Sequence, residues 1–163
     1  MRLISCELQN IKMHECINLE FSNKITIISG ENESGKSSII EAIHKGLFLK
    51  ASSSGSAVES LQSRLHFGKP TVKIIFEAKG DNWTLVKTFT GSSGQTLLKS
   101  ENKGSQVTGP AAEDLLAELT GFTETLGSRQ ASSKLPSRWA HIWIRRGLSG
   151  RNPLLASKDS YDI

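Results

Sequence analysis

The sequence predicts an α/β fold, because two different patterns follow one another along its 163 residues. A glycine-rich loop stands between an apolar, β-branched run at residues 24–28 and a segment whose apolar residues recur at helical spacing from Lys36 onward. Further along, runs of alternating apolar and polar residues predict an antiparallel β-meander. The predicted architecture is a parallel core around the loop, with the meander beside it.

The glycine-rich loop has the form G-x-x-x-x-G-K-[ST] and reads GENESGKSS at residues 30–38. This spacing lets backbone N–H groups surround a phosphate, and the two glycines permit close approaches that a side chain would block. Lys36 is expected to reach the terminal phosphates and is the candidate catalytic residue, while the Ser37 hydroxyl is expected to ligate Mg²⁺. The predicted nucleotide contacts from the loop are Gly30, Asn32, Glu33, Ser34, Gly35, Lys36, Ser37 and Ser38.

The alternative interpretation of this loop is a glycine-rich turn that happens to precede a lysine. It is disfavoured by the loop's context, because a phosphate-binding loop needs a strand before it and a helix after it. Residues 24–28 predict a buried parallel strand, and Ile39, Ile40, Ile43 and Leu47 have helical spacing. Such a helix directs its positive N-terminal end at a bound anion.

The remaining elements are predicted from the same patterns. Strands are expected at residues 3–8, 16–21 and 96–99, and a hairpin at residues 72–89 with its turn at residues 80–82. Residues 58–67 are expected to form a short helix that ends at Gly68. A second helix is expected at residues 110–119, because Pro110 stands at its start and Gly121 just past its end. Residues 139–146 predict a buried strand or the start of a helix.

The composition suits one soluble globular domain, with 37% hydrophobic and 22% charged residues. A net charge of +4 permits contact with nucleic acid without requiring it. Cys6 and Cys16 are too few for a disulfide framework and lack metal-ligand spacing, and Cys6 is expected in the core. Because no apolar run reaches membrane-spanning length and the N-terminus lacks a secretory pattern, we expect a cytoplasmic protein without membrane contact.

Residues 3–43, LISCELQNIKMHECINLEFSNKITIISGENESGKSSIIEAI, resemble the N-terminus of the SMC, SbcC, RecF and RecN proteins; SbcC is the bacterial form of the Rad-fifty repair ATPase. In that family a first strand ends in Asn-aromatic-[Arg/Lys], followed by G-x-N-x-x-G-K-S-x-[IL]-x-[ED]-A-[IL]. The matching residues are Asn10, Ile11, Lys12, Gly30, Asn32, Gly35, Lys36, Ser37, Glu41, Ala42 and Ile43. The resemblance is specific over residues 1–49, moderate over residues 71–89 and weak over residues 115–150.

The resemblance implies a P-loop NTPase of the ABC-ATPase head type, with its N-terminal lobe at residues 1–150 and a polar tail at residues 151–163. It implies ATP and Mg²⁺ as cofactors and a role in DNA double-strand-break repair or chromosome maintenance. The implied partners are DNA and a C-terminal lobe or second subunit that forms a head dimer. In the family, the position of Lys12 carries a basic side chain that approaches the nucleotide phosphates. An exposed turn lysine is the alternative.

Three departures from the family pattern concern the C-terminal third of the sequence. Arg146 stands where the family has a nucleotide-sensing glutamine, and we expect it either to contact phosphate or to lie on the surface. Residues 148–152, LSGRN, resemble the ABC signature LSGGQ, but no apolar strand ending in Asp-Glu follows them. A coiled coil is also missing. We interpret the chain as the N-terminal lobe alone, whether truncated, frameshifted or half of a split pair.

Catalysis is left open by the sequence, because an ATP hydrolase that lacks half of its site should bind nucleotide and turn over poorly. A P-loop GTPase or small-molecule kinase is one alternative, although Ser105 stands where the guanine-binding Asn-Lys-x-Asp motif needs a carboxylate. A non-catalytic DNA-binding module is another, since the arginine-rich residues 129–151 include Trp139 and Trp143. The competing interpretation of that stretch is a solvated face with two core tryptophans, because most such tryptophans lie in a core.

Overall fold

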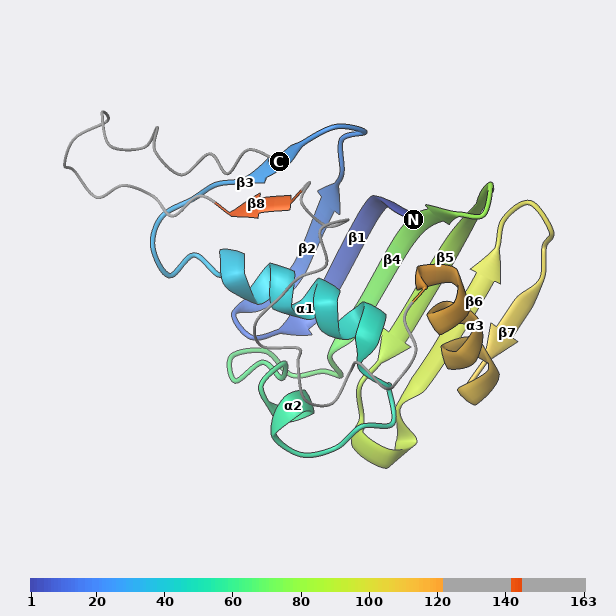
Figure 1. Cartoon of the computed structure of the whole chain (residues 1–163). Helices are drawn as coiled ribbons and strands as arrows, with labels where there is room; N and C mark the ends of the chain where they lie inside the picture. Colours follow the sequence, from blue (N-terminus) through green and yellow to red (C-terminus); the bar gives the residue numbers. More distant parts are fainter. Residues whose placement is uncertain (122–141, 145–163) are drawn as a thin grey trace.

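A six-stranded antiparallel sheet forms the body of the molecule, as the computed structural model shows for the residues it describes, 1–121 and 142–144. The strand order is β2-β1-β4-β5-β6-β7, so the first hairpin adds to the edge of the later meander. Helices α1 and α3 lie on one face of this sheet (Figure 1). A second sheet pairs β3 with β8 in parallel. The described structure is therefore an α/β fold with an antiparallel meander beside a small parallel unit.

The elements have the following bounds. The strands are β1 (Arg2–Ile11), β2 (His14–Glu20), β3 (Thr26–Ile28), β4 (Thr71–Ala78), β5 (Asp81–Thr88), β6 (Gln95–Ser100), β7 (Gln106–Thr108) and β8 (Ile142–Ile144). The helices are α1 (Lys36–Phe48), α2 (Ser56–Glu59), the 3-10 turn η1 (Gly91–Ser93) and α3 (Pro110–Thr120).

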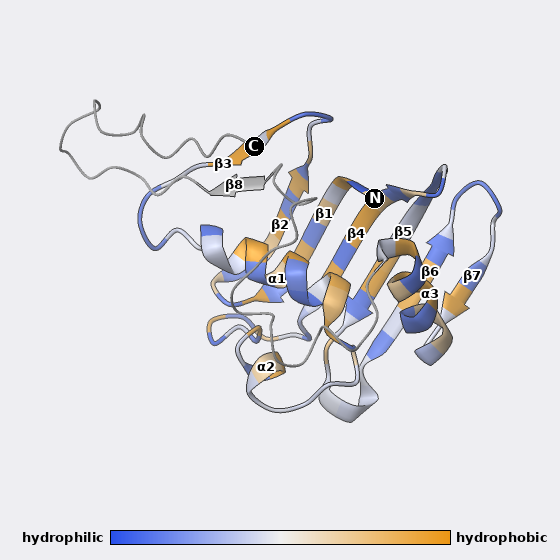
Figure 2. Cartoon of the chain, in the orientation of Figure 1, coloured by the Kyte–Doolittle hydropathy of each residue, from blue (hydrophilic) through white to orange (hydrophobic). Residues whose placement is uncertain are grey.

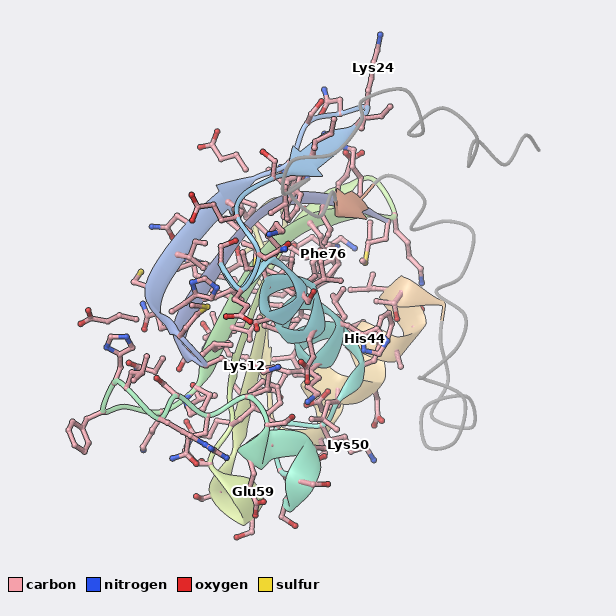
Figure 3. All side chains as sticks on the ribbon, turned by 90° about the vertical axis from the view of Figure 1, so that its left-hand side faces the viewer. Lys12, Lys24, His44, Lys50, Glu59 and Phe76 are labelled. Carbon is pink, nitrogen blue, oxygen red and sulfur yellow. The ribbon has the colours of Figure 1, made fainter. Side chains whose placement is uncertain are left out.

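The core lies between the sheet and the two longer helices. Strand β4 alternates strictly, so that Val72, Ile74 and Phe76 all point toward the helices and are fully buried. The same alternation of apolar and polar residues is visible along β1 and β4 in Figure 2, and Phe76 lies between the sheet and α1 in Figure 3. Gly46 lets α1 approach closely, because a Cβ there would lie 2.6 Å from Val72 Cγ1. This packing fixes α1, and with it the loop that precedes the helix.

Most predicted elements are confirmed. Strands β1 and β6 are longer than predicted, whereas β3 and β8 are shorter than the predicted ranges 24–28 and 139–146. The helix does begin at Lys36, and α3 ends where Gly121 adopts a left-handed conformation with φ of 77°. Cys6 is buried as expected. The hairpin turn lies at Lys79 and Gly80, one residue earlier than predicted, because both have positive φ as a tight two-residue hairpin requires. Strand β7 was not predicted.

The expected helix at residues 58–67 is wrong. Helix α2 ends at Glu59, and the following chain is held instead by Ser63. Its hydroxyl accepts hydrogen bonds from the backbone N–H groups of Leu65 and His66 and donates one to the carbonyl of Lys12. A serine that satisfies nearby backbone groups in this way favours a turn over continued helix.

Strand β3 confirms the predicted parallel pairing but not the predicted burial. Its register joins Thr26 to Ile142 and Ile28 to Ile144. Ile25 and Ile27 are 58% and 65% exposed, so the side of the strand that carries these two side chains is open rather than buried. Strand β8 also confirms a strand within residues 139–146. Arg146, residues 148–152 and the tail at 151–163 lie outside the described residues.

Candidate nucleotide-binding site

The loop between β3 and α1 leads into an uncapped helix. Gly35 occupies the N-cap position in the left-handed conformation, with φ of 85°, and no side chain caps the helix. The first backbone N–H groups of any helix have no partner within it and carry the positive end of the helix dipole. Without a capping side chain, the N-terminal end of α1 is suited to an anion.

Lys36 occupies the centre of this loop and is only 7% exposed. Its ammonium donates hydrogen bonds to the carbonyl of Gly30 at 2.9 Å, to the carbonyl of Glu31 and to the Ser34 hydroxyl at 3.1 Å. A buried ammonium needs such acceptors, because an unpaired charge there would be costly. The backbone carbonyls hold the ammonium at the N-terminal end of α1. Phosphate oxygens bound there would be stronger acceptors than these carbonyls, because they are charged.

The other predicted loop contacts surround Lys36. Asn32, Glu33 and Ser34 are exposed, and Glu33 has a positive φ of 66°. A Cβ on Gly30 would lie 2.9 Å from the Ser34 Oγ, so glycine leaves open the space that the loop encloses. The structure thus brings all eight loop residues predicted from the sequence together at the start of α1.

These residues fit the phosphate chain of a nucleotide and a magnesium ion. Ser37 is exposed in the first turn of α1, and its hydroxyl is a suitable oxygen ligand for Mg²⁺. Within residues 1–121 and 142–144 no group of three or more His, Cys, Asp or Glu residues could hold a metal ion. In this part of the chain, Ser37 is the candidate Mg²⁺ ligand together with the phosphate oxygens, whose charge the metal would neutralise.

The loop packs at Gly35 against Met13, in the turn between β1 and β2, and against His14, at the start of β2. The sequence did not reveal this contact. His14 Nε2 lies 3.4 Å from the carbonyl oxygen of Gly35. A Cβ on Gly35 would lie 2.3 Å from this nitrogen and 2.7 Å from the Met13 sulfur. Gly35 is therefore required twice, by its backbone angle and by the space that the hairpin occupies.

Lys12 lies in the same turn, between β1 and β2, beside α1 (Figure 3). Its ammonium forms an ion pair with Glu41 on α1, and Glu41 also pairs with Lys45 at 2.6 Å. Burial alone would raise the pKa of Glu41, but hydrogen bonds from the two lysines outweigh it and lower the pKa. The predicted contact between Lys12 and nucleotide phosphate stays a prediction.

A buried ion pair at the other end of α1 was also missed. Lys87 is fully buried and donates to Glu113 on α3 at 2.6 Å and to the carbonyl of Leu49 at 2.9 Å. Glu113 also accepts hydrogen bonds from the backbone of Ala51 and from Thr96. Burial lowers the pKa of Lys87, and Glu113 opposes that change. The sequence did carry a signal, because Lys87 shares its side of β5 with Trp83 and Leu85.

A strand, a glycine-rich loop around a buried lysine and an uncapped helix together define the phosphate-binding core of a P-loop nucleotide-binding protein. The chain belongs to the AAA domain family, whose profile matches residues 5–137. Its similarities to Rad50, RecF and SMC proteins identify it as an N-terminal ABC-ATPase lobe of the SMC/Rad50/RecF family. The family predicted from residues 3–43 is thereby confirmed.

Two similar proteins, a Rad50 and a RecF, are much longer than this chain. A "DNA double-strand break repair Rad50 ATPase" of Methanosarcina acetivorans is 36% identical over 111 residues, which cover 64% of this chain and 9% of the relative. The "DNA replication and repair protein RecF" of Chlorobium phaeovibrioides is 33% identical over 104 residues, covering 63% of this chain and 28% of the relative. The chain therefore spans about a tenth of the Rad50 relative and about a quarter of the RecF relative.

A solved structure supports the fold. It is reported as "Structural biochemistry of ATP-driven dimerization and DNA stimulated activation of SMC ATPases" and matches with a TM-score of 0.55 and 21% identity. The match covers 76% of this chain and 81% of the solved chain.

Among the described residues, none of the helices has the length and apolar character needed to cross a membrane.

Proposed function

We propose that the chain binds ATP with Mg²⁺ through residues 30–38, as one lobe of an ATPase head. The observation that carries this proposal is the position of Lys36, held 7% exposed among loop acceptors at the uncapped start of α1. In such a loop the lysine and the helix N-terminus both favour the phosphates. The Ser37 hydroxyl is the proposed Mg²⁺ ligand, and Lys36 is the proposed catalytic cation.

The proposed role is DNA double-strand-break repair or chromosome maintenance, in the cytoplasm. Support comes from the relatives, whose names describe DNA double-strand-break repair in Rad50 and DNA replication and repair in RecF. The proposed partners are DNA and a C-terminal lobe or second subunit that completes a head dimer. The words "ATP-driven dimerization" and "DNA stimulated activation", which describe the similar SMC structure, support this choice.

Hydrolysis by this chain alone is expected to be slow. Phosphoryl transfer depends on positioned charges on both sides of the reacting phosphate, and the sequence contains the P-loop but no apolar strand that ends in Asp-Glu. We expect turnover well below about 1 s⁻¹, the lower end for working enzymes. Faster turnover by a preparation free of other ATPases would mean that this chain contains the missing catalytic carboxylates.

Isothermal calorimetry with the full 163-residue chain tests the proposed binding directly. Lys36→Ala removes a charge-assisted phosphate contact of about 1.5–3 kcal/mol and should weaken ATP binding about tenfold or more. Lys24→Ala is the matched control, because Lys24 is exposed and its side chain projects outward at the top of Figure 3. This control should leave the affinity for ATP unchanged.

Two results would contradict the proposal. Equal ATP affinity in the wild type and in Lys36→Ala would show that residues 30–38 are not the binding site. Tighter binding of GTP than of ATP would favour the GTPase alternative instead. Titrations with Mg²⁺ and with EDTA separate the contribution of the metal from that of the loop.

A further inference from the structure

Glu41 connects the β1–β2 turn to α1 one helical turn beyond the P-loop. It follows Ser37 by four residues, so both lie on the same side of α1 and about 6 Å apart along the helix axis. Its carboxylate is divided between two cations, with Oε2 accepting from Lys12 and Oε1 from Lys45. Lys12 is therefore held close to the start of α1, and its partner there is a carboxylate of the protein rather than a nucleotide phosphate.

The backbone of Lys12 is fixed, whereas its side chain has a single anchor. The Lys12 N–H donates to the carbonyl of Leu61 at 2.9 Å, and the Ser63 hydroxyl donates to the carbonyl of Lys12 at 2.5 Å. The next two residues, Met13 and His14, lie against Gly35. The long side chain of Lys12 thus starts from a fixed point beside the P-loop, with Glu41 as the one acceptor of its ammonium among the described residues.

Lys45 differs from Lys12 in having further acceptors. Its ammonium also donates to the carbonyl of Ala57 at 2.8 Å and to the Ser60 hydroxyl. Lys45 is consequently held in place whether or not Lys12 is present. If Lys12 left, Glu41 would keep one cation, so the loss of Lys12 would not leave an unpaired carboxylate on α1.

We propose that Glu41 is a positioning residue that holds Lys12 beside α1 and competes with the nucleotide phosphates for it. This inference rests on the proposed function. On binding of ATP, the Lys12 ammonium exchanges one anionic partner for another, and the phosphate chain, with its higher charge, is the stronger acceptor. Glu41 thereby reduces the affinity for nucleotide by the free energy needed to release Lys12, and it keeps the cation ready near the site.

The test measures ATP affinity by calorimetry in four full-length chains: wild type, Glu41→Gln, Lys12→Met and the double variant. Glu41→Gln should tighten ATP binding about two- to fivefold, the range of a partly exposed ion pair. Lys12→Met should weaken it. In the Lys12→Met background, Glu41→Gln should have no effect, because there is no Lys12 to release. A double-mutant cycle of this kind isolates the coupling between the two residues.

A matched control separates competition for Lys12 from general charge. Glu59→Gln removes the same negative charge from an exposed residue of α2, whereas the ion-pair partner of Lys12 is Glu41, and it should leave the affinity unchanged. An equal tightening by Glu41→Gln with and without Lys12 would overturn the inference, since Glu41 would then act on the phosphates directly. Weaker ATP binding in Glu41→Gln, with Lys12 present, would also overturn it.

Two further points keep the outcome clear. If Glu41→Gln does not fold, Glu41→Asp keeps the charge but shortens the side chain, and it should give a smaller tightening that again depends on Lys12. If the wild type does not bind ATP, the proposed function fails together with this inference. If the wild type binds ATP and Lys36→Ala does not, while the Glu41 effect is independent of Lys12, only this inference fails.

Discussion

Lys87 and Glu113 form an ion pair in the interior, with 2.6 Å between the Lys87 Nζ and the Glu113 Oε2. The pair joins β5 to α3 and, through the carbonyl of Leu49, to the C-terminal end of α1. The second carboxylate oxygen of Glu113 also has partners, because it accepts hydrogen bonds from the Ala51 backbone N–H and the Thr96 hydroxyl. Such a pair is tolerated in a core when its remaining hydrogen-bonding groups have partners.

Lys87→Met should lower the free energy of unfolding by about 3 kcal/mol, because it leaves the Glu113 carboxylate buried without its cation. Lys87→Met combined with Glu113→Gln should be more stable than Lys87→Met alone, since no unpaired charge remains. Urea denaturation followed by circular dichroism measures both changes. Lys73→Met is the control, because Lys73 pairs with Glu7 on the exposed sheet face and should contribute less than about 1 kcal/mol. Equal losses in the two single variants would contradict the prediction.

Glu41 should make stability depend on acidic pH. Its pKa in the folded state is lowered below the ordinary value of 4.5, so the unfolded chain binds the proton more readily. The stabilisation by Glu41 is therefore present above pH 4.5 and is lost as pH falls through the folded-state pKa. Because the side chain is 34% exposed, we expect less than about 1 kcal/mol. Urea denaturation of wild type and Glu41→Gln from pH 6 to pH 3 should show the difference shrinking; a constant difference would argue against this linkage.

Gly35→Ala should lower both stability and ATP affinity. The new Cβ would meet His14 at 2.3 Å, and alanine disfavours the φ of 85° by about 1 kcal/mol. Gly104→Ala is the matched control, because Gly104 has φ of 62° but no atom within 4 Å of its Cβ position. It should show the backbone cost without the contact. His14→Ala should partly rescue Gly35→Ala in denaturation experiments; no rescue would mean that the hairpin does not limit residue 35.

The P-loop was predictable because its chemistry is local. Nine consecutive residues at 30–38 contain the glycines, the lysine and the hydroxyls, and the strand and helix on either side follow from short-range periodicity. The surroundings of Lys36 are local too, because its three hydrogen-bond acceptors, Gly30, Glu31 and Ser34, belong to the same loop. The family resemblance over residues 3–43 had the same local origin, and the profile match and the relatives confirm it.

The contacts that position the site were not predictable, because they join residues far apart in the sequence. Glu41 is separated from Lys12 by 29 residues, and Glu113 from Lys87 by 26. Period-two alternation did place Lys87 on the inner side of β5, but it gave no partner for the charge. The short helix expected at residues 58–67 failed for a related reason, since Ser63 bonds to the distant backbone of Lys12.

Arg146 provides the last prediction, which rests on the family resemblance. It follows Ile144, the last residue of β8, by two residues in the sequence and lies outside the described residues. We propose that Arg146 contributes to the nucleotide site at the position where the family has a glutamine. An arginine cannot accept a hydrogen bond or ligate a metal, but it can bind phosphate oxygens.

Arg146→Gln should therefore weaken ATP binding in EDTA and increase its dependence on Mg²⁺. The reason is that arginine and Mg²⁺ are both cations and compete for the same phosphate oxygens, so each reduces the benefit of the other. The measurement is ATP affinity for wild type and Arg146→Gln, each with Mg²⁺ and with EDTA. Arg129→Gln is a suitable control for the loss of one positive charge from the same basic stretch. Four affinities without any difference between arginine and glutamine would mean that Arg146 is a surface residue outside the nucleotide site.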